Sequence, residues 1–487
     1  MRRVRGLVIV CGLLACDVAQ GPEPAPLGEL CGAQAPTLAL ALAPEQRLVS
    51  APLYVEGGVL YRVAELAADS EPGLPSFGTS SLWAAGRCGE EPRFIDQVRS
   101  LGVRARWPGV GLACDSHSQL VAVQLAGGQA GGPTWPLYAD CGLGWSGHGL
   151  IGRRDDGELG AGLYLYPDPP DLSSGPAEAI ELLRPVATSG LDGPTFAALE
   201  DLVFVRTPDE SVVSIDLRDG AVRVEQTGVR AFQVSADARY LLWQSHEVDD
   251  GVPAKGPVVL NDRELGISVA LGATSLAYSS SSLAFAGRGL LVLTLGTYQQ
   301  VYRLPELAVI DLPEGLVVDP RGPVDERQWL LHGDWSDETQ LLDLATGEVR
   351  SLFPAAAQLI GRDESGLLEG AGAEAWLLEL RRCCKASRFD AEGPVWRVPL
   401  AGGAPLRAAA RASRYLRIVD DQLVTVVDID ADALGTLLRV DLNNGGEQLL
   451  DDRVFAPSLQ ADADAGVVTY SRVDGERSGV WQLRLPD

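Results

Sequence analysis

Short apolar runs separated by turn-forming residues recur at regular intervals along the second half of the chain. The runs begin at Leu202, Tyr240, Leu283, Trp329, Trp376, Leu423 and Val467. A second, alternating run comes after each of them and carries a leucine near its end, at Leu217, Leu260, Leu304, Leu344, Leu400, Leu442 and Leu485. These leucines are separated by 43, 44, 40, 56, 42 and 43 residues. Short runs in which apolar and polar residues alternate predict β-strands rather than helices.

The repeat length predicts how these strands assemble. A period of about 40–45 residues built from short strands is typical of the blades of a β-propeller. Each blade is a small sheet with two faces to cover, so it cannot be stable alone, whereas blades packed face to face around an axis bury one another. We therefore predict an all-β fold in which residues 195–487 form seven β-propeller repeats.

The turns of the repeats share a pattern. A polar turn precedes the strand in "VSADARYLLW" (234–243) and "LQADADAGVVTYS" (459–471), and a later strand ends in Asp-Leu followed by a glycine-bearing turn, as in residues 216–220. This pattern resembles the TolB-like and WD-repeat-like β-propellers of bacterial envelopes over about residues 195–487. Their usual Ser-Pro-Asp-Gly turn is replaced here by "SADA" or "ADADAG". The resemblance implies the fold but not a close functional match.

Residues 31–194 are less regular and carry four of the cysteines. They form either two or three divergent blades or a separate small β-domain. The last run, "VWQLRLPD", corresponds to the third strand of its unit, so a strand from elsewhere in the chain must complete that blade. Residues 37–43 would supply this strand in one large ring. Residues 178–186 would supply it in a seven-bladed ring with an appendage.

The first 30 residues predict the cellular location of the protein. Arg2, Arg3 and Arg5 precede an apolar run over residues 7–15, which is too short to cross a bilayer, and Cys16 comes directly after it. This layout resembles the bacterial lipoprotein signal, which implies a signal peptide over residues 1–15 and a lipidated Cys16. An ordinary signal cut after Ala15 or near Ala19 is the alternative. Residues 16–30 then form a proline-rich tether, and we expect a lipid-anchored protein on the periplasmic or cell-surface face of the bacterial envelope.

Charge and cysteine content narrow the function further. The formal net charge of −26 disfavours binding to nucleic acid, so membrane attachment would come from the lipid. An even number of cysteines in an exported protein predicts disulfides, and the sequence leaves the pairing open. The candidates are Cys31, Cys88, Cys114, Cys141, Cys383 and Cys384. The histidines are scattered, and no cysteines have the C-x-x-C spacing of a zinc site.

Two motifs with catalytic precedents occur near residue 145. "GLGWSG" (142–147) matches a dinucleotide-binding pattern, but the residues after it predict a strand instead of the required helix. Ser146 and His148 are spaced to lie on one side of a strand, but no third residue is visible to orient the imidazole. Asp115 and His117 have the same spacing, and we expect them in a polar blade turn.

The stretch "DIDADALG" has the carboxylate spacing of the first three ligands of a calcium loop, at Asp428, Asp430 and Asp432. Ala433 and Arg439 stand where that loop needs glycine and glutamate, so it is not an EF-hand. A weak calcium site in a blade loop is the only cofactor hypothesis that the sequence suggests.

The stretch "RRCCKASR" (381–388) is a basic spot on an acidic chain. Adjacent Cys383 and Cys384 predict a surface loop pinned by disulfides. The competing hypothesis is a loop that contacts a ligand or partner through Arg381, Arg382 and Lys385.

The sequence contains no complete catalytic set. We therefore expect a non-enzymatic binding or scaffold module, which uses a loop-bearing face of the propeller to bind an envelope protein or a glycan. The alternative is a propeller hydrolase or lyase with its site at the central channel. That alternative requires the four histidines to meet carboxylates in one funnel: His117, His148, His246 and His332.

Overall fold

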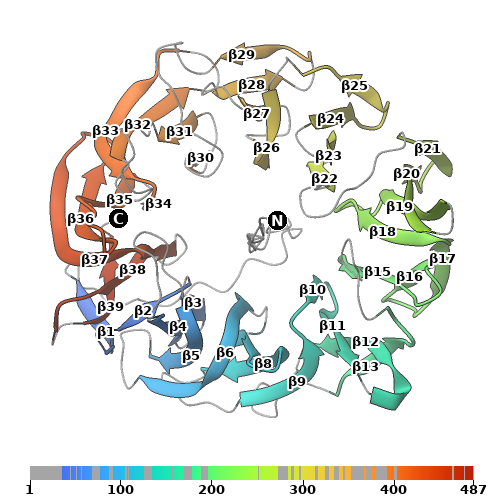
Figure 1. Ribbon diagram of the computed structural model, residues 1–487, viewed down its shortest axis with the longest axis horizontal. Helices are drawn as coiled ribbons and strands as arrows, with labels where there is room; N and C mark the ends of the chain where they lie inside the picture. The colour runs from blue at the N-terminus through green and yellow to red at the C-terminus, as the bar shows by residue number, and fades with distance from the viewer. Residues whose placement is uncertain are drawn as a thin grey trace, which may run out of the picture.

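The computed structural model consists of antiparallel β-sheets arranged in a ring (Figure 1). It describes residues 36–43, 45–50, 52–55, 58–67, 77–86, 92–104, 107, 109–125, 134–155, 157–168, 178–187, 196–249, 252–271, 283–286, 290–295, 298–312, 316–323, 328–333, 339–343, 346–351, 367–368, 374–378, 392–399, 403–419, 421–462, 466–475 and 478–485. Among these residues, no helix has the length and apolarity needed to cross a membrane.

Six of the sheets have four strands each, paired in chain order. The first two contain β10 (Leu143–Ser146), β11 (Gly149–Asp155), β12 (Ala161–Pro167) and β13 (Ile180–Leu183), then β14 (Phe196–Ala198), β15 (Leu202–Arg206), β16 (Val212–Asp216) and β17 (Val222–Gln226). The next two contain β18 (Val229–Val234), β19 (Tyr240–Asp249), β20 (Val252–Asp262) and β21 (Ile267–Ala270), then β22 (Leu283–Ala286), β23 (Leu290–Leu295), β24 (Tyr298–Arg303) and β25 (Ala308–Ile310). The last two contain β26 (Leu316–Pro323), β27 (Gln328–Gly333), β28 (Thr339–Asp343) and β29 (Val349–Ser351), then β30 (Leu367–Leu368), β31 (Glu374–Leu378), β32 (Glu392–Pro399) and β33 (Leu406–Ser413).

Two larger sheets each join two such units through one long strand. The first contains β2 (Gln46–Leu48), β3 (Leu53–Val55), β4 (Gly58–Leu66), β5 (Phe77–Ala85), the long β6 (Arg93–Arg104), β7 (Val110–Asp115), β8 (Gln119–Gln124) and β9 (Thr134–Asp140). The second contains β34 (Leu416–Val419), β35 (Gln422–Val427), β36 (Leu434–Asp441), the long β37 (Glu447–Asp462), β38 (Val467–Arg472), β39 (Gly479–Arg484) and β1 (Thr37–Ala41). A short 3₁₀ helix, η2 (Gly157–Leu159), lies between β11 and β12.

The long strands serve two units because each half pairs with a different neighbour. The first half of β37 pairs with β36, and the second half pairs with β38 after an irregularity between Phe455 and Gln460. With each long strand counted twice, and with β2 and β3 counted as one interrupted strand beside β4, the described strands form ten four-stranded modules, which we number in chain order from β2. The seven modules from β14 onward correspond to the seven repeats predicted for residues 195–487, and three further modules precede them in the same ring. The β-propeller prediction is confirmed.

The position of each turn is set by the antiparallel pairing. Turns between first and second strands, and between third and fourth strands, lie on one side of the ring, which we call the 1–2 face. Turns between second and third strands, and the connections between modules, lie on the other side, the 2–3 face. First strands such as β10, β26 and β34 lie toward the centre, and fourth strands such as β17 and β29 lie at the rim (Figure 1).

The turns after several third strands are closed in the same way. The glycine amides of Gly220, Gly266, Gly347 and Gly445 each donate to an aspartate carbonyl four residues earlier at 2.8 Å. These glycines have φ between +66° and +73°, which a residue with a Cβ adopts only at a cost. The register also corrects one expectation. In module 5 the aspartate is Asp262, so the residue equivalent to Leu217 is Arg263 and not Leu260.

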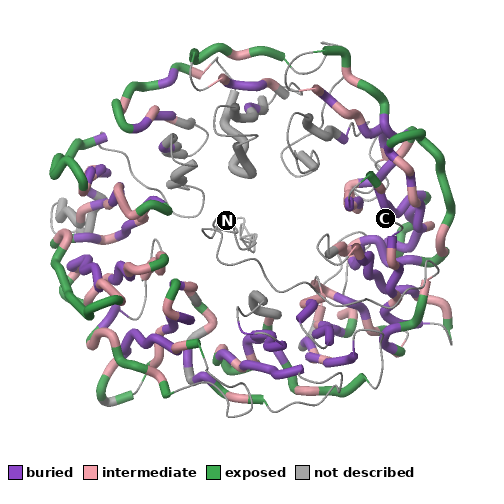
Figure 2. Tube along the Cα trace, turned by 180° about the vertical axis from the view of Figure 1, so that it is seen from behind, coloured by how far each residue is buried: buried purple, intermediate pink, exposed green. Residues whose placement is uncertain are grey.

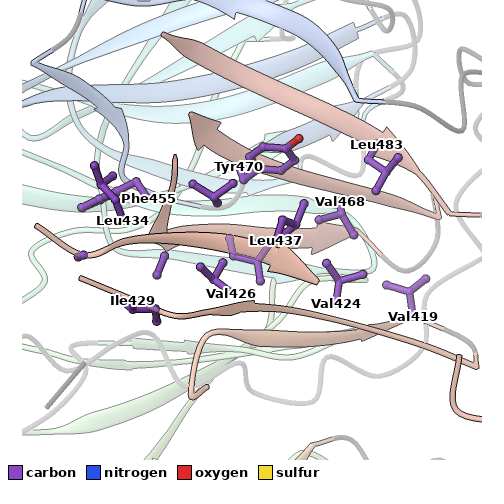
Figure 3. Close-up of a cluster of buried hydrophobic side chains, with 14 of the residues drawn as sticks. Val419, Val424, Val426, Ile429, Leu434, Leu437, Phe455, Val468, Tyr470 and Leu483 are labelled. Carbon is purple, nitrogen blue, oxygen red and sulfur yellow. The ribbon is translucent and has the colours of Figure 1, made fainter. Parts of the chain in front are cut away.

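Neighbouring modules cover each other's apolar faces. One core cluster combines Val426 of module 9 with Val468 and Tyr470 of module 10 (Figure 3). Another combines Phe204 of module 4 with Phe232 of module 5. Burial is concentrated between the modules, and exposed positions gather at the rim (Figure 2). This is the mutual shielding that the repeats require, since no single sheet could bury both of its faces.

Residues from the two ends of the described chain close the ring. Strand β1 pairs with β39 as the fourth strand of module 10, with Thr37 opposite Gln482. The hydroxyls of Tyr54 and Thr469 lie 2.5 Å apart across the same junction. Of the two segments considered for this role, residues 37–41 therefore complete the last module. The other segment contains β13, the fourth strand of module 3.

One predicted disulfide is present among the described residues. Cys114 at the end of β7 is bonded to Cys141 after β9, with their Cα atoms 5.7 Å apart. Both lie at the 2–3 end of module 2, where the bond ties the second strand to the connection leading into module 3. The other predicted disulfide cysteines lie outside the described residues: Cys31, Cys88, Cys383 and Cys384.

Candidate functional site

A histidine–aspartate pair joins modules 3 and 4 on the 1–2 face. His148 lies in the turn between β10 and β11, and its Nε2 is 2.9 Å from Oδ1 of Asp201 in the turn between β14 and β15. A backbone hydrogen bond also connects the two turns, because Gly147 N donates to Glu200 O at 2.7 Å. The two side chains are 35% and 45% exposed, so the pair is open to solvent at the surface of the ring.

Ser146 supports the turn that carries His148. Its side chain is buried, and its Oγ donates to Gly149 O at 2.9 Å and accepts from His148 N at 3.2 Å. A hydroxyl held in this way against the backbone is not presented to a substrate. The glycine-rich pattern over residues 142–147 is also structural, since β11 comes after it where a dinucleotide site needs a helix.

Further charges surround this pair on the 1–2 face. Arg218 contacts Asp216 at 2.6 Å in the turn after β16. The hydrogen bonds from the Arg218 side chain and backbone lower the pKa of Asp216 to about 2, and the nearby His148 adds to this effect. A carboxylate with a lowered pKa remains ionised and cannot serve as a general acid near neutral pH. Asp216 is therefore suited to electrostatic contact rather than to donating a proton.

The other histidines do not join His148. His117 lies in the turn between β7 and β8 on the 2–3 face, with its side chain 82% exposed. Asp115 Oδ1 accepts from the backbone N of His117 and of Gln119, both at 2.8 Å, which confirms the predicted polar turn. His246 and His332 lie in the second strands of modules 5 and 7, close to the ends that lead to the 2–3 face. The four histidines therefore occupy four modules, and the two that lie in turns, His148 and His117, are on opposite faces.

The carboxylates proposed for calcium have separate roles. Asp428 forms a two-pronged ion pair with Arg411, with N–O distances of 2.8 and 3.1 Å. Asp430 Oδ1 accepts from the backbone N of Asp432 and of Leu434, both at 2.9 Å, and so closes the turn. Within the described ranges, no group of three or more His, Cys, Asp or Glu side chains could hold a metal ion. The spacing of Asp428, Asp430 and Asp432 therefore reflects an ion pair with Arg411 followed by a turn that Asp430 closes.

Two sets of predicted functional residues cannot be placed. The lipidation site Cys16 and the basic-loop residues Arg381, Arg382 and Lys385 lie outside the part of the chain that the structure describes. The predictions made for them remain predictions.

The first strands carry a charge pattern that sequence reasoning missed. Of the first-strand residues whose side chains are described, the charged ones are all arginines, namely Arg47, Arg99, Arg230 and Arg417. By sequence, first strands also contain Arg104, Asp319, Arg321 and Asp462. The whole chain has 40 basic and 66 acidic residues, so these strands reverse its charge balance. The signal visible in the sequence was a lone arginine inside short apolar runs such as "LRIV" (416–419).

The similarity of this chain to known proteins is weak. No protein-family model matches the chain, and no curated protein matches it. Among solved structures, the oligogalacturonate lyase from Vibrio parahaemolyticus has 9% identity and a TM-score of 0.33, covering 80% of this chain and 98% of its own. A eukaryotic initiation factor has 11% identity and a TM-score of 0.43, covering 76% and 94%. A WD40-repeat structure has 13% identity and a TM-score of 0.25, covering 59% and 92%. At these scores the similarity carries no argument about function, and the fold assignment rests on the strand pairing.

Proposed function

We propose that the protein is a bacterial lipoprotein, anchored through Cys16, whose propeller is a non-enzymatic binding or scaffold module for an envelope protein or a glycan. The separation of the histidines carries this proposal. Catalysis by general acids and bases requires the reacting groups to meet within hydrogen-bond reach, whereas the four histidines lie in four different modules, with His148 and His117 on opposite faces. This separation supports a binding role over an enzyme that would need the four histidines in one funnel.

The architecture suits binding. The ring holds its turns on two faces, and neighbouring turns are tied together, as the contacts of His148 with Asp201 and of Gly147 with Glu200 illustrate. Rigid presentation of many turns lowers the entropy cost of binding a partner. The acidic chain makes an anionic membrane surface an unfavourable partner, which leaves a lipid anchor as the means of attachment.

The anchor is tested by metabolic labelling with an alkyne-bearing palmitate. The full-length protein should incorporate the label and fractionate with membranes, and Cys16→Ser should lose both properties. If the unsubstituted protein is secreted without label, an ordinary signal peptide is the correct interpretation and the lipoprotein proposal fails.

The binding role is tested by photo-crosslinking in cells. A photoreactive amino acid at position 117 reports on the 2–3 face and one at position 200 on the 1–2 face. A third at position 222, an exposed valine on the rim strand β17, is the matched control. Adducts of defined mass from one face, and none from the rim, are expected. Absence of adducts from both faces would contradict the proposal, as would labelling of Ser146 by a fluorophosphonate.

A further inference from the structure

The first strands of modules 9 and 10 bring an arginine and a glutamine together at the inner edge of the ring. Arg417 lies on β34 and Gln460 on the second half of β37. The Arg417 guanidinium donates to Gln460 Oε1 at 3.0 Å and to Leu416 O at 2.7 Å. Both side chains are half-buried. Among the described residues, the partners of this cation are therefore neutral oxygens.

Other described arginines are divided between two situations. Arg263 pairs with Glu225 and Arg472 pairs with Asp451. Arg439 resembles Arg417, because it donates to a glutamine oxygen, but it lies on an exposed surface. A half-buried guanidinium without a carboxylate has lost part of its hydration and has gained no opposite charge in return. Burial accordingly lowers the pKa of Arg417.

The contact with Gln460 also fixes the orientation of the amide. A guanidinium only donates hydrogen bonds, so the amide atom that faces it must be the oxygen. The amide NH₂ group is then turned away from Arg417 and supplies further donors. Guanidinium and amide N–H groups at one edge form a donor set that matches a carboxylate or phosphate, both of which arginine binds with two parallel hydrogen bonds.

A second arginine reaches the same segment of β37 from the opposite side. The Arg47 guanidinium of module 1 lies 5.5 Å from the ring centroid of Phe455, whereas Arg417 approaches Gln460 from module 9. Residues 455–460 of β37 thus contact one arginine from each neighbouring module. On a chain with a formal net charge of −26, the two guanidiniums favour an anion at this inner edge, and by sequence Asp462 on the same strand opposes it.

We propose that Arg417 and Gln460 form a subsite for an oxyanion group, carboxylate or phosphate, of a ligand bound at the inner edge of the ring. The proposal goes beyond the binding role of the turn-bearing faces and does not depend on it. It assigns chemistry to first strands, where the sequence motifs gave no candidate.

The test is calorimetric titration of the purified full-length protein with citrate and, separately, with inorganic phosphate at constant ionic strength. We expect at least one of the two anions to bind, and the preference between them identifies the ligand group as carboxylate or phosphate. Arg417→Gln should weaken the affinity at least tenfold. Gln460→Glu should do the same, because the new carboxylate neutralises Arg417 within the protein.

Gln460→Glu also keeps the test independent of folding defects, since it adds an ion pair instead of removing one, and its melting temperature should not fall. Arg411→Gln is the matched control, because Arg411 belongs to module 8, next to module 9, but is already paired with Asp428. Binding of neither anion overturns the proposal. So does unchanged binding by Gln460→Glu, or an equal loss in Arg411→Gln. None of these outcomes affects crosslinking from the turn faces, so the two proposals fail separately.

Discussion

The Arg263 guanidinium of module 5 lies 2.8 Å from the Glu225 carboxylate of module 4. Their side chains are 18% and 4% exposed, and the guanidinium also lies 4.8 Å from the ring centroid of Phe204. Ser214 donates a further hydrogen bond to Glu225 at 2.6 Å, in addition to the two from Arg263. The pair therefore joins two modules. Without it, each module would leave a largely buried charged side chain without this opposite charge.

Breaking this pair should destabilise the ring. Arg263→Met removes the closer cation from the buried Glu225 carboxylate and leaves only the exposed Arg223, 4.0 Å away, which we expect to cost about 3 kcal/mol in free energy of unfolding. Arg218→Met is the control, since solvent screens its pair with Asp216 more strongly and this variant should lose much less stability. Denaturant unfolding measures both. Equal losses in the two variants would show that the position of the pair between modules adds nothing.

The same carboxylate predicts a pH dependence. Burial raises the pKa of Glu225, but hydrogen bonds from Arg263 and Ser214 outweigh it and hold the pKa below its usual value. The contribution to stability is therefore complete above the unfolded-state pKa of about 4.3 and is lost as the pH falls through the lower folded-state pKa. We expect Glu225→Gln to be less stable than the unsubstituted protein at pH 7 and to approach it below about pH 4. A stability difference that is constant with pH would refute this assignment.

The closing strand offers a comparison within five residues. Leu40 on β1 is 2% exposed and packs with module 1, whereas Leu38 on the same strand is 44% exposed. Leu40→Ala should cost about 2–4 kcal/mol in free energy of unfolding, and Leu38→Ala less than about 1 kcal/mol. If Leu40→Ala has no effect on thermal unfolding, β1 does not hold the ring closed.

The disulfide predicts a redox dependence of stability. Cys114 and Cys141 are 27 residues apart, and closing a loop of that size should contribute about 3 kcal/mol. The double substitution of both cysteines by alanine should lower the melting temperature by several degrees, with a reductant producing the same shift in the unsubstituted protein. Non-reducing peptide mapping checks the pairing directly, and recovery of alkylated Cys114 would contradict it.

The architecture could be predicted from the amino-acid sequence, because the information for it is local and repeated. Period-two alternation, polar turns and the Asp-Leu turn after Val213 recur along the repeats, so the strands and their order can be inferred from short windows. The third-strand position of "VWQLRLPD" likewise showed that a strand must come from elsewhere, and β1 supplies it.

The side-chain contacts between modules could be established only from the folded chain. Glu225 and Arg263 are 38 residues apart, His148 and Asp201 are 53 apart, and Arg417 and Gln460 are 43 apart. Each pair crosses a boundary between modules, and its geometry depends on how one twisted sheet packs on the next. Packing also decided the roles of the motif residues. Ser146 and Asp430 hold turns through hydrogen bonds to the backbone, and Asp428 pairs with Arg411. Spacing along a strand determines which residues lie on the same face of the sheet. Contact between modules depends instead on how the sheets pack, which the spacing does not encode.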